Sequence, residues 1–246
     1  MDRESLPVER RAARLPVELR GAATSSRTVG GYAAVFGLPS EDLGGFKERV
    51  DRRAMNKTRG DGWSGVVCRF NHQDNFLLGA TRSGTLRLDV DGYGLGYEVD
   101  LPECRSDILE MVTRGDIVNS SFAFQALDDE WAYIDGIAQR TLMSVRLIDV
   151  APVTTPAYPD ATVGLRSLAA HMDAALGDVT ELAAQGELRR LFTRSDQRDH
   201  APARRSSKSL QRLLAIHAKR WPPDQTEKAP QTGHQAVAEI LGKRWQ

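Results

Sequence analysis

Polar residues that together could carry out acyl transfer interrupt otherwise apolar segments of the sequence. His72 stands in the polar segment 71–75, which follows an apolar run. Ser120 and Ser121 interrupt a second apolar run, and Asp149 interrupts a third. A polar side chain that is buried in such a segment needs a hydrogen-bond partner, so each position is a candidate for a shared site.

These residue types match the parts of a nucleophilic serine site. A neutral imidazole such as that of His72 can take a proton from a hydroxyl near pH 7. A serine hydroxyl becomes a nucleophile when such a base lies at hydrogen-bond distance. A buried carboxylate such as that of Asp149 is costly unless it is paired, and an imidazole N–H is a natural partner that would also orient the ring.

Each residue also has a structural interpretation that the spacing alone leaves open. A histidine at a strand end is commonly a surface or structural residue, and two serines in a strand commonly form cross-strand or backbone hydrogen bonds. Asp149 could point outward from an edge strand or pair with Arg146. Cys68 stands four positions before His72 and is interpreted as a small buried hydrophobic residue.

Common signatures of other enzyme classes are absent from the sequence. It contains no Gly-rich phosphate loop ending in Lys-Ser or Lys-Thr, no G-x-G-x-x-G motif after a strand, no H-E-x-x-H motif and no G-x-S-x-G motif. Two cysteines and five scattered histidines show no zinc-binding spacing. We therefore expect no metal and no cofactor.

The overall composition predicts a cytoplasmic globular protein. The chain has 246 residues, and its 33 Lys and Arg balance 33 Asp and Glu, so no net charge attracts the whole molecule to nucleic acid or a membrane. Two cysteines cannot build a disulfide framework and suit a reducing compartment. No apolar run approaches the roughly 18 residues of a membrane span, and the charged N-terminal segment lacks the apolar core of a secretory signal.

Hydrophobic patterning predicts mostly β structure in the middle of the chain. Apolar and polar residues alternate most clearly on either side of the turn-forming pair Asp91-Gly92, and Asp135-Gly136 marks a second hairpin. Strands are expected at 30–37, 46–50, 65–70, 84–90, 93–101, 117–127, 131–134 and 137–153, with a turn at 128–130. The last of these runs is long enough to contain a bulge.

One helix is expected among these strands. Residues 105–114 carry apolar residues at helical spacing, and Gly115 stands where a helix commonly ends. Short strands with few helices, rather than alternating strands and helices, predict an α+β, mainly β fold. Its core is expected to be antiparallel and barrel-like, with inserted helices and a helical C-terminal extension.

Composition divides the chain into three parts. Residues 1–29 are rich in Arg and Ala and broken by prolines, which predicts a flexible or loosely docked arm. Residues 30–166 form the β-rich domain, and residues 167–246 form a basic extension broken by linkers. Helices are expected in the extension at 167–192, 209–221 and 234–245. Acidic residues interrupt its basic stretch, which favours a solvated helix face over a nucleic-acid site.

The order of sequence blocks across residues 30–166 resembles that of the head-maturation (prohead) proteases of tailed bacteriophages, whose fold is similar to that of herpesvirus assemblins. The blocks that carry the resemblance are GYAAVF (31–36), FKERVDRRAM (46–55), RFNHQD (69–74), LLGATRSGTLRL (77–88), GLGYEVDLP (94–102), DILEMVTRGDIVNSSFAF (107–124) and VRLIDVAPVTTPAYPDATVGLR (145–166). The whole series in this order is fairly specific to the family.

The resemblance implies catalytic roles for three residues. The family's histidine, in an N-H-D-like motif, falls on His72, and its serine, in an S-F-G-F-like motif, falls on Ser121 rather than Ser120. The acidic residue of the family's E-V-S-like strand falls on Asp149, where the family more often has Glu. The family also prefers Gly where Ala123 stands.

The resemblance also implies where the protein acts and on what. Such a protease is packaged inside the immature capsid in the host cytoplasm, cleaves the scaffold portion of the major capsid protein, and often digests itself. Similarity to the assemblin fold implies a dimer. The alternative is a non-catalytic assembly protein that keeps a protease-like core, and the presence of both His72 and Ser121 favours the enzyme.

Overall fold

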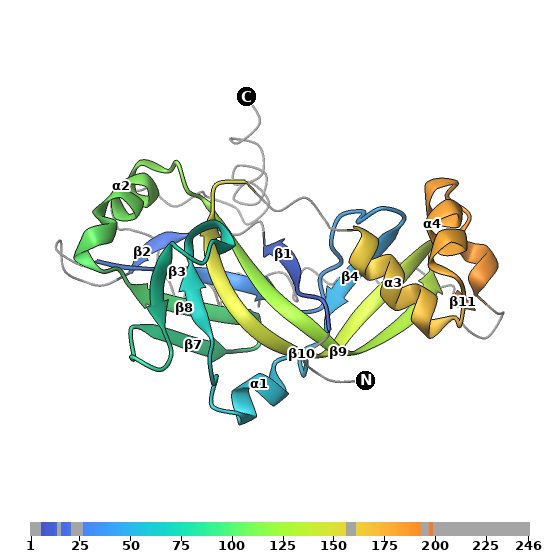
Figure 1. Cartoon of the computed structure of the whole chain (residues 1–246), viewed down its shortest axis with the longest axis horizontal. Coiled ribbons are helices and arrows are strands. Elements are labelled where there is room, and N and C mark those ends of the chain that lie inside the picture. The colour runs from blue at the N-terminus through green and yellow to red at the C-terminus, as the bar shows by residue number, and fades with distance from the viewer. Residues whose placement is uncertain (1–5, 14–15, 21–26, 156–160, 193–196, 199–246) are drawn as a thin grey trace, which may run out of the picture. The chain divides into compact units, whose positions relative to one another are not determined.

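The computed structural model describes residues 6–13, 16–20, 27–155, 161–192 and 197–198 (Figure 1). The strands are β1 (Glu9–Ala13), β2 (Glu18–Arg20), β3 (Thr28–Val35), β4 (Phe46–Val50), β5 (Val67–Arg69), β6 (Leu77–Ala80), β7 (Leu86–Val90), β8 (Gly94–Asp100), β9 (Asn119–Ile134), β10 (Ile137–Val153) and β11 (Gln197–Arg198). The α-helices are α1 (Asn56–Gly60), α2 (Ser106–Arg114), α3 (Ala161–His171) and α4 (Leu176–Ala184), and the 3-10 turns are η2 (Phe70–His72), η3 (Glu103–Arg105) and η4 (Leu188–Leu191).

The hairpin of β9 and β10 is the centre of the larger sheet (Figure 1). The two strands are 16 and 17 residues long and pair antiparallel along their lengths. Asp135 and Gly136 turn between them with φ of 51° and 83°, the left-handed pair that a two-residue hairpin favours. The strand order of this sheet is β1-β9-β10-β5-β6, with β4 also on β10 and β11 on β9.

The main hydrophobic core draws on this sheet and on a second, smaller one. The smaller sheet has the order β2-β3-β8-β7. Its Val29, Leu95 and Val99 belong to the same buried cluster as Phe122 and Val150 of the larger sheet. One face of the β9–β10 hairpin is therefore committed to the core, and the opposite face is available for a site.

The fold is α+β and mainly β, as expected, and most strand pairs are antiparallel, but the barrel-like core was wrong and the larger sheet is mixed. Over the described residues the strands form two sheets and no closed barrel, and β4 and β5 both run parallel to β10. Residues 138–142 of β10 pair with β4, and residues 149–150 pair with β5. Alternation in a sequence reports which residues of a strand are exposed, but not which strand pairs with it or in which direction.

The turn expected at 128–130 was also wrong, because β9 continues through these residues. All three remain in the ladder opposite β10. Asp129 accepts hydrogen bonds from Arg140 Nε at 2.5 Å and from Ser167 Oγ at 2.5 Å. A run of acidic residues usually favours a turn, but a carboxylate that finds such partners can remain in a strand.

The flexible arm expected over residues 1–29 was wrong for the part of it that forms strands. β1 pairs antiparallel with β9, and β2 pairs antiparallel with β3. Glu9 and Arg11 of β1 are 2% and 8% exposed. Charged residues usually indicate solvated chain, but these two lie 2.7 Å apart in a buried ion cluster where each neutralises the other.

Residues on both sides of the domain boundary expected at residue 166 pack in the same hydrophobic cluster. Leu168 of α3 and Phe192 belong to a second buried cluster that also contains Phe46 of β4 and Trp131 of β9. Figure 1 shows α3 and α4 at the β4 end of the β9–β10 hairpin. The first helices of the predicted extension therefore cover part of the larger sheet.

Several local predictions agree with the structure. α2 ends at Gly115, which has a left-handed φ of 81°, and β7 and β8 form the hairpin expected around Asp91. The helices expected at 209–221 and 234–245, and most of the basic stretch after Arg190, lie outside the described residues.

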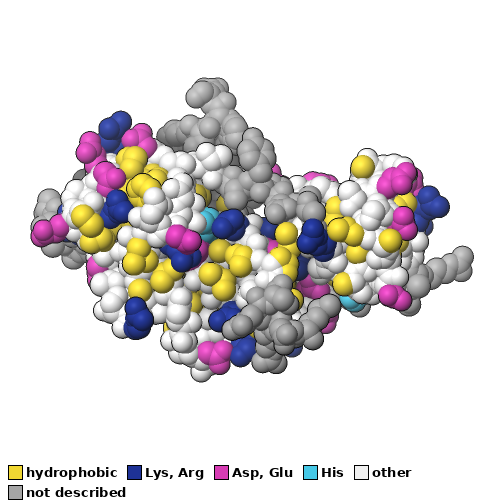
Figure 2. Space-filling model, viewed as in Figure 1, with side chains coloured by type: hydrophobic (Ala, Val, Ile, Leu, Met, Phe, Trp, Pro, Cys, Tyr) yellow, Lys and Arg dark blue, Asp and Glu magenta, His cyan; other side chains and the backbone are white. Residues whose placement is uncertain are grey.

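On the face shown in Figure 2, acidic and basic side chains are interspersed with hydrophobic ones.

Removal of residues 167–246 should destabilise the protein, because it uncovers Phe46 and Trp131. Each large apolar side chain that loses its buried environment costs about 1.5–3 kcal/mol. In urea unfolding followed by circular dichroism, a chain ending at residue 166 should unfold at a clearly lower urea concentration than the full chain. A chain ending at residue 198 should match the full chain. Equal midpoints for all three would show that α3 and α4 do not support the sheet.

Candidate active site

Ser121, His72 and Asp149 form a continuous chain of short contacts. The Nε2 atom of His72 lies 2.7 Å from Ser121 Oγ, and its Nδ1 atom lies 2.5 Å from Asp149 Oδ1. The side chains of His72 and Asp149 are 5% and 3% exposed. The structure therefore brings together the three residues that the sequence singled out, across 49 and 77 residues of chain.

A β-bulge in β10 places Asp149 on the same face as Ser121. In the β9–β10 ladder, Leu147 lies opposite Phe124, and Asp149 lies opposite the residue just before Phe124, so Ile148 is the additional residue. In a regular strand Leu147 and Asp149 would share a face, because successive side chains alternate. The bulge leaves Leu147 in the core and turns Asp149 toward the opposite face.

The two adjacent serines have different surroundings because they lie on opposite faces of β9. Ser120 points into the core, where its Oγ lies 3.1 Å from the hydroxyl of buried Tyr97. Ser121 points toward His72. The structural interpretation of a strand serine therefore applies to Ser120, and the interpretation as a nucleophile fits Ser121.

The loop that carries His72 has an unusual backbone conformation. Asn71 and His72 have φ of 52° and 57°, in a left-handed region that costs about 1–2 kcal/mol for a residue with a side chain. The Asn71 Oδ1 atom accepts a hydrogen bond from the Thr154 N–H at 3.0 Å, just after β10 ends. This contact ties the loop to the strand that carries Asp149 and so fixes the position of the imidazole.

Arg69 is a fourth member of the site that the sequence interpretation missed. Its Nη1 donates to Asp149 Oδ2 at 2.9 Å, and its Nη2 lies 3.1 Å from Asp74 Oδ1. The available signal was its position three residues before His72, within the same family-like block. Arg69 does not contact Ser121 in any described hydrogen bond, so it acts on the site through Asp149.

The charge state of Asp149 follows from two opposing effects. Burial alone would raise the pKa of this carboxyl, but hydrogen bonds and positive charge from His72 and Arg69 outweigh burial and lower the pKa below its ordinary value. Asp149 is therefore ionised at neutral pH. An ionised carboxylate only accepts hydrogen bonds, so the Nδ1 atom of His72 must carry the proton between them.

This tautomer leaves the other imidazole nitrogen free to act as a base. In the neutral ring with a proton on Nδ1, the lone pair lies on Nε2, which faces Ser121 Oγ at 2.7 Å. The ring can therefore accept the hydroxyl proton while the oxygen attacks a carbonyl carbon. The orienting contact with Asp149 stabilises the positive charge that this transfer puts on the ring.

The remaining candidate residues have structural surroundings. Cys68 is fully buried, and burial together with the charge of Asp149 raises the pKa of its thiol well above the ordinary value. Such a thiol stays protonated and packs as a small hydrophobic residue. Arg146 is exposed and is not the cation that pairs with Asp149. His171 ends α3, and the other three histidines of the extension lie outside the described residues.

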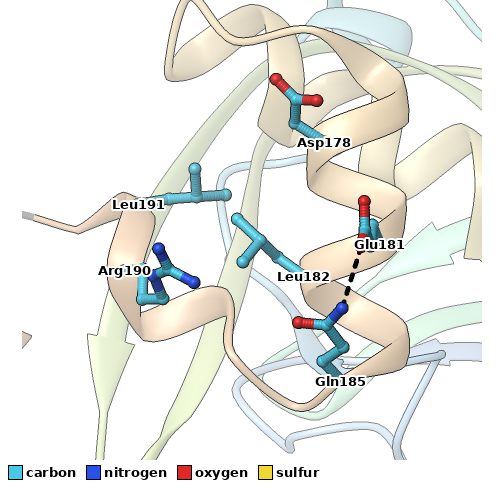
Figure 3. Close-up of a pocket in the computed structure, with 6 residues that line it drawn as sticks. All are labelled: Asp178, Glu181, Leu182, Gln185, Arg190 and Leu191. Atoms are coloured by element: carbon cyan, nitrogen blue, oxygen red, sulfur yellow. Dashed lines mark hydrogen bonds between the residues drawn. The ribbon is translucent and has the colours of Figure 1, made fainter.

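A pocket formed by α4 and η4 contains none of the site residues (Figure 3). It is lined by Asp178, Glu181, Leu182, Gln185, Arg190 and Leu191. Within it, Gln185 donates a hydrogen bond to Glu181 at 3.0 Å. The lining includes no Ser, Cys or His, so the pocket offers no second acyl-transfer site.

Two kinds of feature are absent from the part of the chain that the structure describes. No group of three or more His, Cys, Asp and Glu side chains there could hold a metal ion. No helix there is long and apolar enough to cross a membrane.

A hydrogen-bonded Ser–His–Asp chain is the arrangement by which serine hydrolases carry out acyl transfer. The chain belongs to the caudovirus prohead serine proteases, because the model of that family matches residues 14–174, more than half of its length. Membership establishes serine-protease chemistry and a role in capsid maturation. No curated protein gives a significant match to the chain. No solved structure gives one either.

Asp149→Asn should keep the fold but lower the rate of cleavage by about 10³- to 10⁴-fold. The amide can donate to Nδ1, which favours the tautomer whose Nε2 already carries a proton. The rate of capsid-precursor cleavage measures the effect, and circular dichroism checks the fold. Asp74→Asn is the matched control, because Asp74 is 90% exposed and touches Arg69 from the solvent side. A fully active Asp149→Asn protein would mean that Ser121 and His72 act without this third residue.

Asn71→Ala should lower both stability and the cleavage rate. It removes the acceptor for Thr154 N–H and places alanine in a left-handed conformation, which together cost about 1–3 kcal/mol. Asn71→Asp keeps an acceptor oxygen and a residue type that tolerates this conformation, so it should stay close to the wild type. Thermal unfolding and precursor cleavage are the measurements. If the alanine protein matched the wild type in both, the loop would not depend on this contact.

Proposed function

We propose that this chain is the endopeptidase that cleaves the scaffold portion of the major capsid protein, and itself, as a phage head matures. One observation carries the proposal: the Ser121–His72–Asp149 chain of contacts lies entirely within the segment that matches the family. A protein that had kept only the fold as an assembly module would not need these three groups at 2.5 and 2.7 Å.

The proposed reaction begins with proton transfer from Ser121 to His72. The serine oxygen attacks the scissile carbonyl carbon while Nε2 takes the hydroxyl proton. His72 then gives this proton to the leaving amine, so the peptide bond breaks and an acyl-enzyme remains. Water attacks the acyl group with His72 again as the base, and the serine is released with its proton. Asp149 keeps its charge throughout and holds Nδ1 in place.

The proposed partners and place of action follow from the family. The substrate is the scaffold part of the capsid protein, met inside the immature capsid in the host cytoplasm. The imidazole supplies both base and acid, so the mechanism calls for no cofactor. We further propose that the enzyme forms a dimer, on its resemblance to the assemblin fold, and that residues beyond 198 direct it to the assembling capsid.

Ser121→Ala should abolish cleavage of a co-expressed capsid precursor, because it removes the nucleophile. Ser120→Ala is the matched control, since Ser120 contacts Tyr97 on the core side of the same strand. It should retain much of the activity. Gel electrophoresis of the precursor and of the protease itself reports both substrates. Equal processing by the wild-type and Ser121→Ala proteins would overturn the assignment and favour a non-catalytic assembly protein.

A further inference from the structure

The candidate nucleophile is covered by the N-terminal strand of its own chain. Ser121 is 0% exposed, and its Oγ donates a hydrogen bond to the main-chain carbonyl of Arg11 at 3.0 Å. This carbonyl belongs to β1, which lies along β9 with Arg11 opposite Phe122 and Ala12 opposite Ser121. Within this arrangement no substrate carbonyl can reach Ser121.

The contact with β1 also competes directly with activation of the serine. The hydroxyl of Ser121 has one proton and two acceptors within reach, the Arg11 carbonyl at 3.0 Å and His72 Nε2 at 2.7 Å. When the proton points to Arg11, it is not available to the base. A donor to a carbonyl oxygen lies on the oxygen side of that group, whereas attack needs the serine oxygen over the carbon. β1 therefore occupies the site without being placed for cleavage.

A buried ion cluster holds β1 in this position. Arg11 lies 2.9 Å from Glu48 of β4, and Glu9 lies 2.7 Å from Arg140 of β10. Glu48 and Arg140 also pair with each other at 3.0 Å, and all four residues are buried. The two residues that belong to β1 can therefore leave without stranding a lone charge, because Glu48 and Arg140 remain paired.

Besides the ion cluster, β1 is held by its antiparallel ladder with β9 and by the Arg11 guanidinium, which lies 5.7 Å from the centre of the Phe124 ring. None of residues 9–12, the part of β1 whose side chains the structure describes, belongs to either hydrophobic cluster. β1 is the last strand at its edge of the larger sheet, so its departure would expose one side of β9 and leave the remaining strand order intact. The match to the family starts at residue 14, after β1 has ended. β1 therefore lies outside the segment that matches the family.

We propose that β1 is a resident blocking strand on the β9 edge, and that an extended segment of the substrate binds there as an antiparallel strand after displacing it. This inference rests on the proposed function. An extended peptide that adds to the freed edge of β9 can pair with the main-chain groups that β1 uses, and a small shift along this edge would bring a carbonyl carbon, rather than a carbonyl oxygen, to Ser121 Oγ. Glu48 and Arg140 would then favour a segment with an acidic residue followed two positions later by arginine, the spacing of Glu9 and Arg11.

The first test measures access to Ser121 by its rate of labelling with a fluorophosphonate probe on the full chain. Glu9→Gln removes the charge that pairs with Arg11 and Arg140, so it should label at least tenfold faster than the wild type. Glu18→Gln is the matched control, because Glu18 pairs with Arg20 in the other sheet and is 38% exposed. An excess of the peptide LPVERRAA, residues 6–13, should slow labelling of the Glu9→Gln protein again. The same peptide with Gln in place of both Glu9 and Arg11 should not slow labelling.

A second measurement uses only the wild-type chain, so it decides the matter even if Glu9→Gln does not fold. Labelling should become faster with urea well below the unfolding transition, because release of β1 exposes surface before the core opens. Labelling that is equal in wild type and Glu9→Gln, or unaffected by low urea, would overturn the blocking strand while leaving the protease intact. If Ser121 labels under none of these conditions, the proposed function itself fails.

Discussion

The buried, ionised carboxylate of Asp149 is the constraint on which the rest of the site depends. A lone charge in this position would be strongly destabilising, so the fold has to supply a cation or a hydrogen-bond donor on each side of it. Arg69 does so from β5 and His72 from the loop after it, through contacts of 2.9 and 2.5 Å. The same requirement explains the bulge at Ile148, which turns the carboxylate away from the apolar core. Stability and the proposed chemistry coincide here, because the imidazole that hydrogen-bonds to Asp149 is also the base of the proposed reaction.

A second group of buried charges is organised differently. In this group, Glu9 and Arg11 of β1 meet Glu48 and Arg140, and Arg140 also pairs with Asp129. Burial alone would lower the pKa of Arg140, but its carboxylate partners outweigh burial and raise the pKa above the ordinary value. This cluster is divisible, since one acid–base pair comes from β1 and the other from β4 and β10. Breaking a buried pair by removing one member costs about 3–5 kcal/mol, but removing a neutral pair together avoids the unpaired charge. The cluster can therefore hold a strand firmly and still release it as a unit.

The residues that lie together in the candidate site could be predicted from the sequence better than the pairing of the strands. His72, Ser121 and Asp149 could be singled out because each is a polar residue in an apolar segment, and the order of family-like blocks separated Ser121 from Ser120. The parallel pairing of β4 and β5 with β10 could not be predicted, because it depends on contacts between strands distant in sequence. The left-handed φ of Asn71 could not be predicted either, and nor could the burial of Glu9 and Arg11. Both features are permitted only by partners elsewhere in the fold. In each case the local preference of the residue was overruled by a specific hydrogen bond or ion pair.

The energetics of an edge strand explain why a covered nucleophile is compatible with an active enzyme. When an extended substrate replaces β1, the hydrogen bonds that β9 loses to one strand are regained with the other, so the ladder contributes little to the net free energy of exchange. Residues 9–12 of β1 contribute no member to the hydrophobic clusters, so the exchange costs little burial of apolar side chains. The net free energy of exchange then depends mainly on the ion pairs. Glu9 and Arg11 of β1 pair with Arg140 and Glu48, and the substrate must offer charges that pair with them as well. A few buried charges thus decide whether the Ser121 proton is shared with Arg11 or given to His72, and a high local concentration of substrate strands favours the second outcome by mass action.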